Sequence, residues 1–292
     1  MPNRKIILEE GIYHITQRAP GKELIFIEKA DYLTFISILK QVSKKFNLTI
    51  FCFSLLSNHL HILTQIKERN LSQAMQELFK RYAQIFNIKY ERKGHVFCGR
   101  YRAASCNDDR YFLIISLYIH LNAYRAGMTD SPFKYKWHSL DVYIKKIRSS
   151  FVNPKLILDG IFANDTVKAK EIYKNLIKGV SGIKTDDFME EKNTFTKLYD
   201  NFVKWVKTDS KKNTIYKDSP IIKSFVDIEK GIEAFKNKKR TSSPQDKKAI
   251  IYLIQQLISR GYNKEEIAEK LDINRVTIYR LLKQNHQRAL SK

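Results

Sequence analysis

The chain has 292 residues, 43% hydrophobic and 12% aromatic, which excludes a disordered protein and allows one sizeable domain with a smaller module. A net charge of +23 favours a polyanionic partner, most commonly nucleic acid. The three cysteines form no C-x-x-C pair, no apolar signal segment is visible, and no apolar run is long enough to span a membrane. We therefore expect a reduced, cytoplasmic protein.

The first part of the chain alternates between strand and helix patterns. A β-branched and aromatic stretch at 11–17 predicts a strand, and 24–27 predicts a short return strand. Apolar residues at helical spacing predict a helix at 31–46, with Asp31 as its cap. Two apolar runs within 51–63, separated by a polar turn, predict a β-hairpin.

The pattern continues with a helix at 71–88, a strand within 95–106 and a helix at 109–126 that ends at Gly127. The order strand, helix, two strands, helix, strand is typical of one antiparallel sheet with helices on one face. We therefore predict an α+β, ferredoxin-like fold followed by an all-α C-terminal region.

Composition shifts divide the chain into three predicted domains. The α+β domain is expected at 1–145. A helical middle region without a recognisable motif follows at 146–240. Polar and basic segments at 207–220 and 236–244, within this region and at its end, are typical of linkers. The last domain is expected at 241–292.

The last domain predicts three helices, at 244–260, 263–271 and 275–284. Asn263 and Glu266 have the spacing of a capping box at the start of the second helix. Only three residues separate the second helix from the third, as in a helix-turn-helix, although a plain three-helix bundle has the same pattern. Because the exposed side of the last helix is basic and polar, we expect it to bind DNA. The expected contacts are Arg275, Thr277, Tyr279 and Arg280.

His59 and His61 stand two residues apart in the second strand of the predicted hairpin. Side chains alternate along a strand, so both imidazoles share one face while Leu60 and Ile62 share the other. Neutral imidazole is a common ligand of divalent metals, so the pair is a candidate metal site. The alternative is a pair of ordinary surface or core histidines.

Tyr118 and Asn122 are four residues apart in the helix predicted before Gly127, so they lie on one helix face. If that face lies against the histidines, the Asn122 amide oxygen joins His59 and His61 as a metal ligand. The Tyr118 hydroxyl then stands beside the metal as a nucleophile for a phosphodiester, and the product is a 5′-phosphotyrosine with a free 3′-OH. A core tyrosine is the alternative.

Several segments resemble the HUH single-tyrosine transposases of insertion sequences and their relatives, the REP-associated tyrosine transposases. The matching segments are YHITQR (13–18), SNHLHIL (57–63), GHVFCGRYR (94–102) and YIHLNAYRAG (118–127). They span about residues 5–140. The C-terminal helix-turn-helix pattern resembles that of resolvase-type recombinases.

The resemblance implies an RRM-like sheet and Mg²⁺ or Mn²⁺ at His59 and His61. It implies Asn122 as the third ligand and Tyr118 as the nucleophile. Members of the family cleave and rejoin single-stranded DNA beside imperfect hairpins. Three arginines of the matching segments are expected to contact this DNA: Arg18, Arg100 and Arg102.

Two other functions stay open at this point. A non-catalytic regulator would bind DNA through the helix-turn-helix alone. A replication-initiation or relaxase-type nickase would share the histidine pair, but such proteins usually have a different order of tyrosine and histidine motifs. Whether the protein is a monomer or a homodimer, and which DNA sequence it recognises, does not follow from the sequence.

Overall fold

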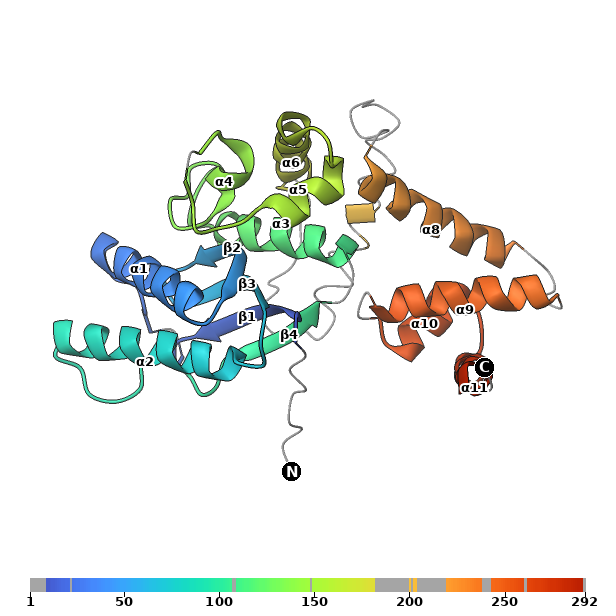
Figure 1. Ribbon diagram of the computed structural model, residues 1–292, viewed down its shortest axis with the longest axis horizontal. Coiled ribbons are helices and arrows are strands. Elements are labelled where there is room, and N and C mark those ends of the chain that lie inside the picture. Colours follow the sequence, from blue (N-terminus) through green and yellow to red (C-terminus); the bar gives the residue numbers. More distant parts are fainter. Residues whose placement is uncertain are drawn as a thin grey trace. The chain divides into compact units, whose positions relative to one another are not determined.

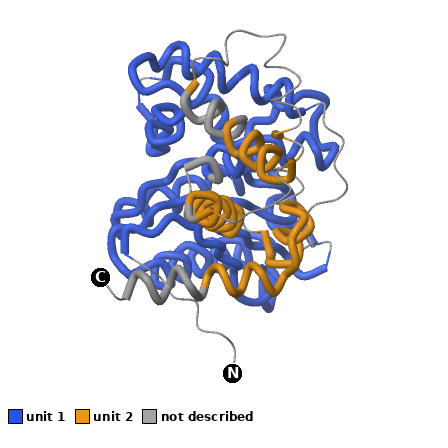
Figure 2. Tube along the Cα trace, turned by 90° about the vertical axis from the view of Figure 1, so that its right-hand side faces the viewer, with its two compact units in different colours: residues 1–184 blue, residues 185–292 orange. Residues whose placement is uncertain are grey.

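The computed structural model describes residues 9–21, 23–106, 109–147, 149–181, 200, 202–203, 219–237, 243–259 and 262–290. The chain divides into two compact units, residues 1–184 and residues 185–292 (Figure 2). Each unit is described by itself.

The first unit is built on a four-stranded antiparallel sheet. Its strands are β1 (Ile12–Arg18), β2 (Leu48–Leu55), β3 (His59–Ile66) and β4 (Arg102–Cys106). They lie in the order β2-β3-β1-β4, and each neighbouring pair is antiparallel. The predicted α+β fold with one antiparallel sheet is therefore confirmed, and β3 with its two histidines lies at the centre of the sheet.

Three long helices lie against this sheet: α1 (Lys29–Lys45), α2 (Leu71–Lys89) and α3 (Asp109–Arg125). Figure 1 shows α1 and α2 on one side and α3 on the other, so helices cover both faces rather than one. Both faces carry apolar side chains that need cover from solvent. Ile15 and Ile62 are buried on the side of α1 and α2. Cys52 and Leu63 are buried on the side of α3.

Three shorter helices complete the first unit: α4 (Leu140–Ile144), α5 (Lys155–Phe162) and α6 (Thr166–Ser181). In α6 the buried residues recur at helical spacing, among them Ile172, Tyr173 and Leu176. Both α5 and α6 pack against α3 (Figure 1). The beginning of the predicted middle region thus packs with the sheet domain, and most of the remainder, including the predicted linkers, lies outside the described residues.

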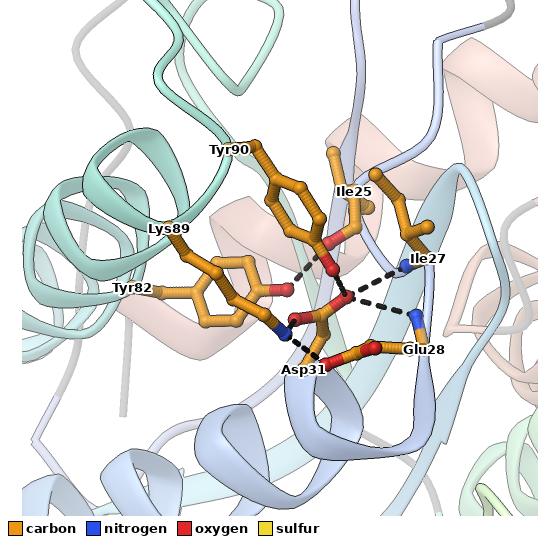
Figure 3. Close-up of polar contacts among 7 residues, drawn as sticks. All are labelled: Ile25, Ile27, Glu28, Asp31, Tyr82, Lys89 and Tyr90. Atoms are coloured by element: carbon orange, nitrogen blue, oxygen red, sulfur yellow. Dashed lines mark hydrogen bonds and ion pairs between the residues drawn. The ribbon is translucent and has the colours of Figure 1, made fainter.

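Asp31 fixes the first turn of α1 (Figure 3). Its carboxylate accepts hydrogen bonds from the backbone N–H groups of Ile27 and Glu28, both at 2.9 Å, and from the side chains of Lys89 and Tyr90. Burial alone would raise the pKa of this carboxyl, but the hydrogen bonds hold it below its usual value. Asp31 is therefore the third helical residue of a capping box whose cap is Glu28, and not the cap itself.

Residues 24–27 do not form the predicted return strand. The backbone N–H groups of Ile25 and Phe26 both donate to the carbonyl oxygen of Ser57, at 2.8 and 3.1 Å. The Tyr82 hydroxyl donates to the Ile25 carbonyl (Figure 3). Because these backbone groups are satisfied by the hairpin turn and by α2, the segment needs no strand partner.

The second unit contains α8 (Pro220–Lys236), α9 (Pro244–Ser259), α10 (Lys264–Leu271) and α11 (Arg275–Leu290). Asn263 caps α10 in the predicted capping box with Glu266. Asp272 ends α10 in the left-handed conformation, and Asn274 accepts the backbone N–H of Val276 at the start of α11. No helix within the described ranges is long and apolar enough to cross a membrane.

Candidate active site

Histidines from two neighbouring strands form a buried cluster on the α3 side of the sheet. His59 and His61 project from β3 to the same face. The antiparallel register places Thr16 of β1 opposite His61, and His14 lies on the same face two residues earlier. The rings of His14 and His61 stack with centroids 5.1 Å apart, and those of His59 and His61 meet edge to face at 5.3 Å.

One ring nitrogen of His61 is held by β1 and the other is available. Its Nδ1 lies 3.0 Å from Nε2 of His14 and 3.3 Å from Oγ1 of Thr16. Its Nε2 is buried and has no hydrogen-bond partner among the described residues. Metal-binding histidines commonly have this arrangement, in which one nitrogen is oriented by a hydrogen bond while the other carries the lone pair.

His59 is oriented in the same way by its neighbour in the turn. Its Nδ1 lies 2.7 Å from Oδ1 of Asn58. An amide oxygen only accepts hydrogen bonds, so the proton lies on Nδ1 of His59 and Nε2 is the basic nitrogen. Both imidazoles of the pair therefore present Nε2.

Burial keeps His14 and His61 neutral. It lowers the pKa of His61 well below 6.5, and the charges of His14 and His59 act in the same direction. It also lowers the pKa of His14 to about 4. A histidine must be neutral to bind a metal, so these imidazoles are in the ligand form at neutral pH.

Tyr118 of α3 lies against this cluster. Its ring meets His61 edge to face with the centroids 5.5 Å apart, and His14 at 6.2 Å. The side chain is only 5% exposed. The structure thus brings together the phenol and the imidazoles that were predicted to share one site, although Tyr118 and His61 lie far apart in the sequence.

Asn122 lies one turn after Tyr118 and is also buried. Its side-chain Nδ2 has no hydrogen-bond partner among the described residues, so the amide is not committed to another group through this atom. Within the described ranges no group of three or more His, Cys, Asp or Glu side chains is arranged as a metal site. The candidate ligand set is instead two imidazole nitrogens and one amide oxygen, and these donors fit a divalent metal that keeps positions for phosphate oxygens.

Arginines border the histidine face of the sheet. Arg18 lies opposite His59 in the register of β1 and β3, and Arg102 of the edge strand β4 lies opposite Thr16. Paired residues of antiparallel strands share a face, so both arginines project to the side of the cluster. Arg102 and Arg100, which precedes β4, are exposed, as is Arg18.

His14 and Thr16 were not among the site residues predicted from the sequence. The strand pattern YHIT contained a usable signal, because residues 14 and 16 share one face of any strand formed there. Only the pairing of β1 with β3 shows that this face is the one carrying His61.

The predicted DNA contacts of the last helix lie at the start of α11. Arg275 forms an ion pair with Glu265 and donates to the Tyr279 hydroxyl at 3.4 Å. The ammonium of Lys264 lies 3.8 Å from the centroid of the Tyr279 ring. The hydrogen bond from Arg275 and the charge of Lys264 lower the pKa of Tyr279. Arg280 is exposed and Thr277 is half-buried.

Comparisons with known proteins address the first unit. A solved structure of a REP-associated tyrosine transposase bound to a REP hairpin matches with 14% sequence identity and a TM-score of 0.42, and the match covers 47% of this chain and 81% of that one. No curated protein matches the chain. Residues 8–122 match the family model described as "Transposase IS200 like". The segment that carries the histidine cluster and Tyr118 therefore lies within the match to the IS200-like transposase family.

Proposed function

We propose that the first unit cleaves and rejoins single-stranded DNA through a covalent bond to Tyr118. The observation that carries the proposal is the contact of the Tyr118 ring with His61, whose Nε2 is buried and has no hydrogen-bond partner among the described residues. A phenol next to available ligand nitrogens is the equipment that a tyrosine nucleophile needs. The family of this segment supports a transposase reaction.

The proposed reaction exchanges one phosphodiester for another. The Tyr118 oxygen loses its proton and attacks phosphorus, the bond from phosphorus to the 3′ oxygen breaks, and that oxygen takes up a proton to become a 3′-OH. A 5′-phosphotyrosine is left, and the reverse attack by a 3′-OH rejoins DNA without a nucleotide cofactor. His59, His61 and Asn122 would hold Mg²⁺ or Mn²⁺, which neutralises phosphate charge.

The arginines beside the cluster support single-stranded DNA as the substrate. Arg18, Arg100 and Arg102 are exposed, and none of them belongs to the buried cluster. Such cations bind phosphates without reading the base sequence, and strand affinity falls as salt rises. We propose that the strand lies along this margin next to a hairpin, with its scissile phosphate directed to Tyr118.

The test uses a hairpin-bearing strand labelled at its 3′ end in one experiment and at its 5′ end in another. Wild-type protein is expected to give a labelled protein–DNA adduct with the 3′ label and a shortened free strand with the 5′ label. Tyr118→Phe should give neither product. Tyr124→Phe is the matched control, since Tyr124 is half-buried on another face of the same helix.

A second experiment tests whether adduct formation depends on a divalent metal. Chelation by EDTA should abolish the adduct, and Mg²⁺ or Mn²⁺ should restore it. Adduct formation by Tyr118→Phe would refute the assigned nucleophile. A wild-type protein that binds duplex DNA but never forms the adduct would support the alternative function, a non-catalytic DNA-binding regulator. Release of a nicked strand without any covalent intermediate would refute the strand-transfer mechanism.

We also infer that the second unit binds duplex DNA through α11. Val276 and Tyr279, at the start of this helix, are 71% and 45% exposed, and Arg280 is exposed beside them. An exposed apolar side chain among basic ones suits base edges and thymine methyl groups of a major groove. In full-length protein, Arg280→Ala should weaken duplex binding by about tenfold and leave adduct formation on single strands unchanged.

A further inference from the structure

Arg125, the last residue of α3, has no role in the reaction described so far. It follows Tyr118 by seven residues and Asn122 by three, so all three side chains project from one face of the helix. Side chains of a helix lean toward its N-terminus. A long side chain that leans this way is directed along this face toward Asn122 and Tyr118.

The guanidinium of Arg125 is buried rather than extended into solvent. All three of its nitrogens are inaccessible. Burial lowers its pKa to about 10, and the charge of Tyr118 acts in the opposite direction, so the guanidinium stays cationic at neutral pH. A buried cation is costly unless anionic or dipolar groups compensate it. The electrostatic interaction between the two groups indicates that the guanidinium acts on the Tyr118 oxygen.

The end of α3 does not require Arg125 as a cap, although a cation at a helix C-terminus interacts well with the helix dipole. Backbone N–H groups already satisfy the carbonyls of the last turn: Asn122 accepts from Ala126 at 2.9 Å, Ala123 from Met128 at 3.0 Å, and Tyr124 from Gly127 at 3.1 Å. Gly127 has a φ of 69°, as in a standard left-handed helix end. A capping role therefore leaves the position of the guanidinium unexplained.

We propose that Arg125 is a catalytic residue that donates guanidinium hydrogen bonds to a non-bridging oxygen of the scissile phosphate. The inference rests on the proposed function of Tyr118. Arg125 transfers no proton: it holds the phosphate on the Tyr118 side of the site and stabilises the negative charge on the non-bridging phosphate oxygens while the tyrosine bond forms and the 3′ bond breaks.

The first measurement is the rate of adduct formation at saturating DNA. Arg125→Gln in the full chain should slow it by about 100-fold, because a charged donor to the transition state is lost. Arg125→Lys keeps the charge and should recover part of the rate. Arg81→Gln is the matched control. Arg81 lies on α2, on the side of the sheet opposite to α3, and forms an ion pair with Glu77 of the same helix. Thermal melting reports whether each variant is folded.

The second measurement separates a phosphate contact from a structural role. In the uncleavable Tyr118→Phe background, affinity is measured for a strand with its normal scissile phosphate and for one with a neutral methylphosphonate there. With Arg125 present, the methylphosphonate should weaken binding by about tenfold. In the double variant Tyr118→Phe/Arg125→Gln, or in Tyr118→Phe/Arg125→Met if the glutamine variant does not fold, the difference in affinity between the two strands should be clearly smaller.

The outcomes distinguish this inference from the proposed function. If wild type forms no adduct through Tyr118, the proposed function fails. If the adduct forms but methylphosphonate weakens binding equally with and without Arg125, only the role of Arg125 is overturned. An Arg125→Gln protein that reacts at the wild-type rate also overturns it.

Discussion

Two buried clusters adjoin α3, one around His61 and one formed by His120 and its hydrogen-bond partners, and their hydrogen bonding differs. In the cluster of His14, His59 and His61, one nitrogen of His61 is held and the other has no partner among the described residues. His120 lies two residues after Tyr118, and both of its nitrogens are bonded: Nδ1 to the Tyr173 hydroxyl at 2.7 Å and Nε2 to the Ser139 hydroxyl at 2.8 Å.

The hydrogen bonds around His120 form a continuous network in which both of its ring nitrogens take part. The Tyr173 hydroxyl donates to Ser116 at 3.0 Å, and Ser116 donates to the Leu113 carbonyl at 2.7 Å. Tyr173 therefore accepts the Nδ1 proton of His120, and Ser139 donates to its Nε2. These contacts join α3 to α6 and to the segment before α4, so His120 serves the packing of the unit.

The comparison shows that burial and a depressed pKa do not by themselves identify a reactive histidine. Burial lowers the pKa of both His61 and His120 well below 6.5. The difference lies in the second ring nitrogen, which is bonded in His120 and available in His61. Only a histidine with an available nitrogen next to a nucleophile can take part in the proposed chemistry.

The largest expected effect comes from removal of the His61 imidazole. His61→Ala should lower the rate of adduct formation by about a thousandfold or more, because the loss of metal binding removes several kcal/mol of charge stabilisation. Strand affinity in a mobility-shift assay should change little, since the exposed arginines supply most of it. A His61→Ala protein with normal cleavage would show that the available nitrogen has no function.

A smaller effect is expected from His14, which orients His61 without binding metal in the proposed site. His14→Gln should weaken metal affinity by about 10- to 100-fold, as for other groups that orient a metal ligand. Isothermal titration with Mn²⁺ measures this, and excess metal should restore most of the cleavage rate. Thr16→Val tests the longer contact to the same nitrogen and should have less effect.

The reciprocal prediction concerns His120. His120→Leu leaves the hydroxyls of Tyr173 and Ser139 without their buried partner, which should lower the free energy of unfolding by about 1–3 kcal/mol. Urea denaturation measures the loss. The cleavage rate per folded molecule should stay within about twofold of wild type. Loss of cleavage with unchanged stability would assign His120 to the chemistry and remove the distinction between the clusters.

The last prediction concerns acid stability. The pKa of His14 is about 4 in the folded protein and 6.5 without the fold. Below pH 6.5 the unfolded chain therefore binds a proton that the folded chain does not, and stability falls as the pH decreases from about 6.5 to about 4. Urea denaturation of metal-free protein across this window should show the decline, and His14→Gln should make it shallower. A flat profile for wild type would contradict the buried neutral state.

Local patterns in the sequence were sufficient for much of the site. The alternation of side chains along a strand predicted that His59 and His61 share one strand face. Helical spacing predicted that Tyr118 and Asn122 share one helix face, because the periods of strand and helix are properties of the backbone. The capping box of Asn263 and Glu266 was equally predictable, since its hydrogen bonds lie within one turn of helix.

Other features depended on contacts between distant segments. Residues 24–27 had the composition of a strand, but the Ser57 carbonyl took their N–H groups. Asp31 had the residue type of a cap, but the helix begins earlier and uses it inside the first turn. In each case the backbone had more than one local solution, and the neighbouring element selected one of them.

The sequence by itself determined the order of the elements, the α+β class and the two pairs of residues that share a face. Only the tertiary structure decided that α3 lies on the histidine side of the sheet, that β1 brings His14 and Thr16 to His61, and that His120 is fully bonded elsewhere. The physical reason is that backbone periodicity fixes the direction of a side chain within its own element, whereas strand register and helix packing fix what it meets.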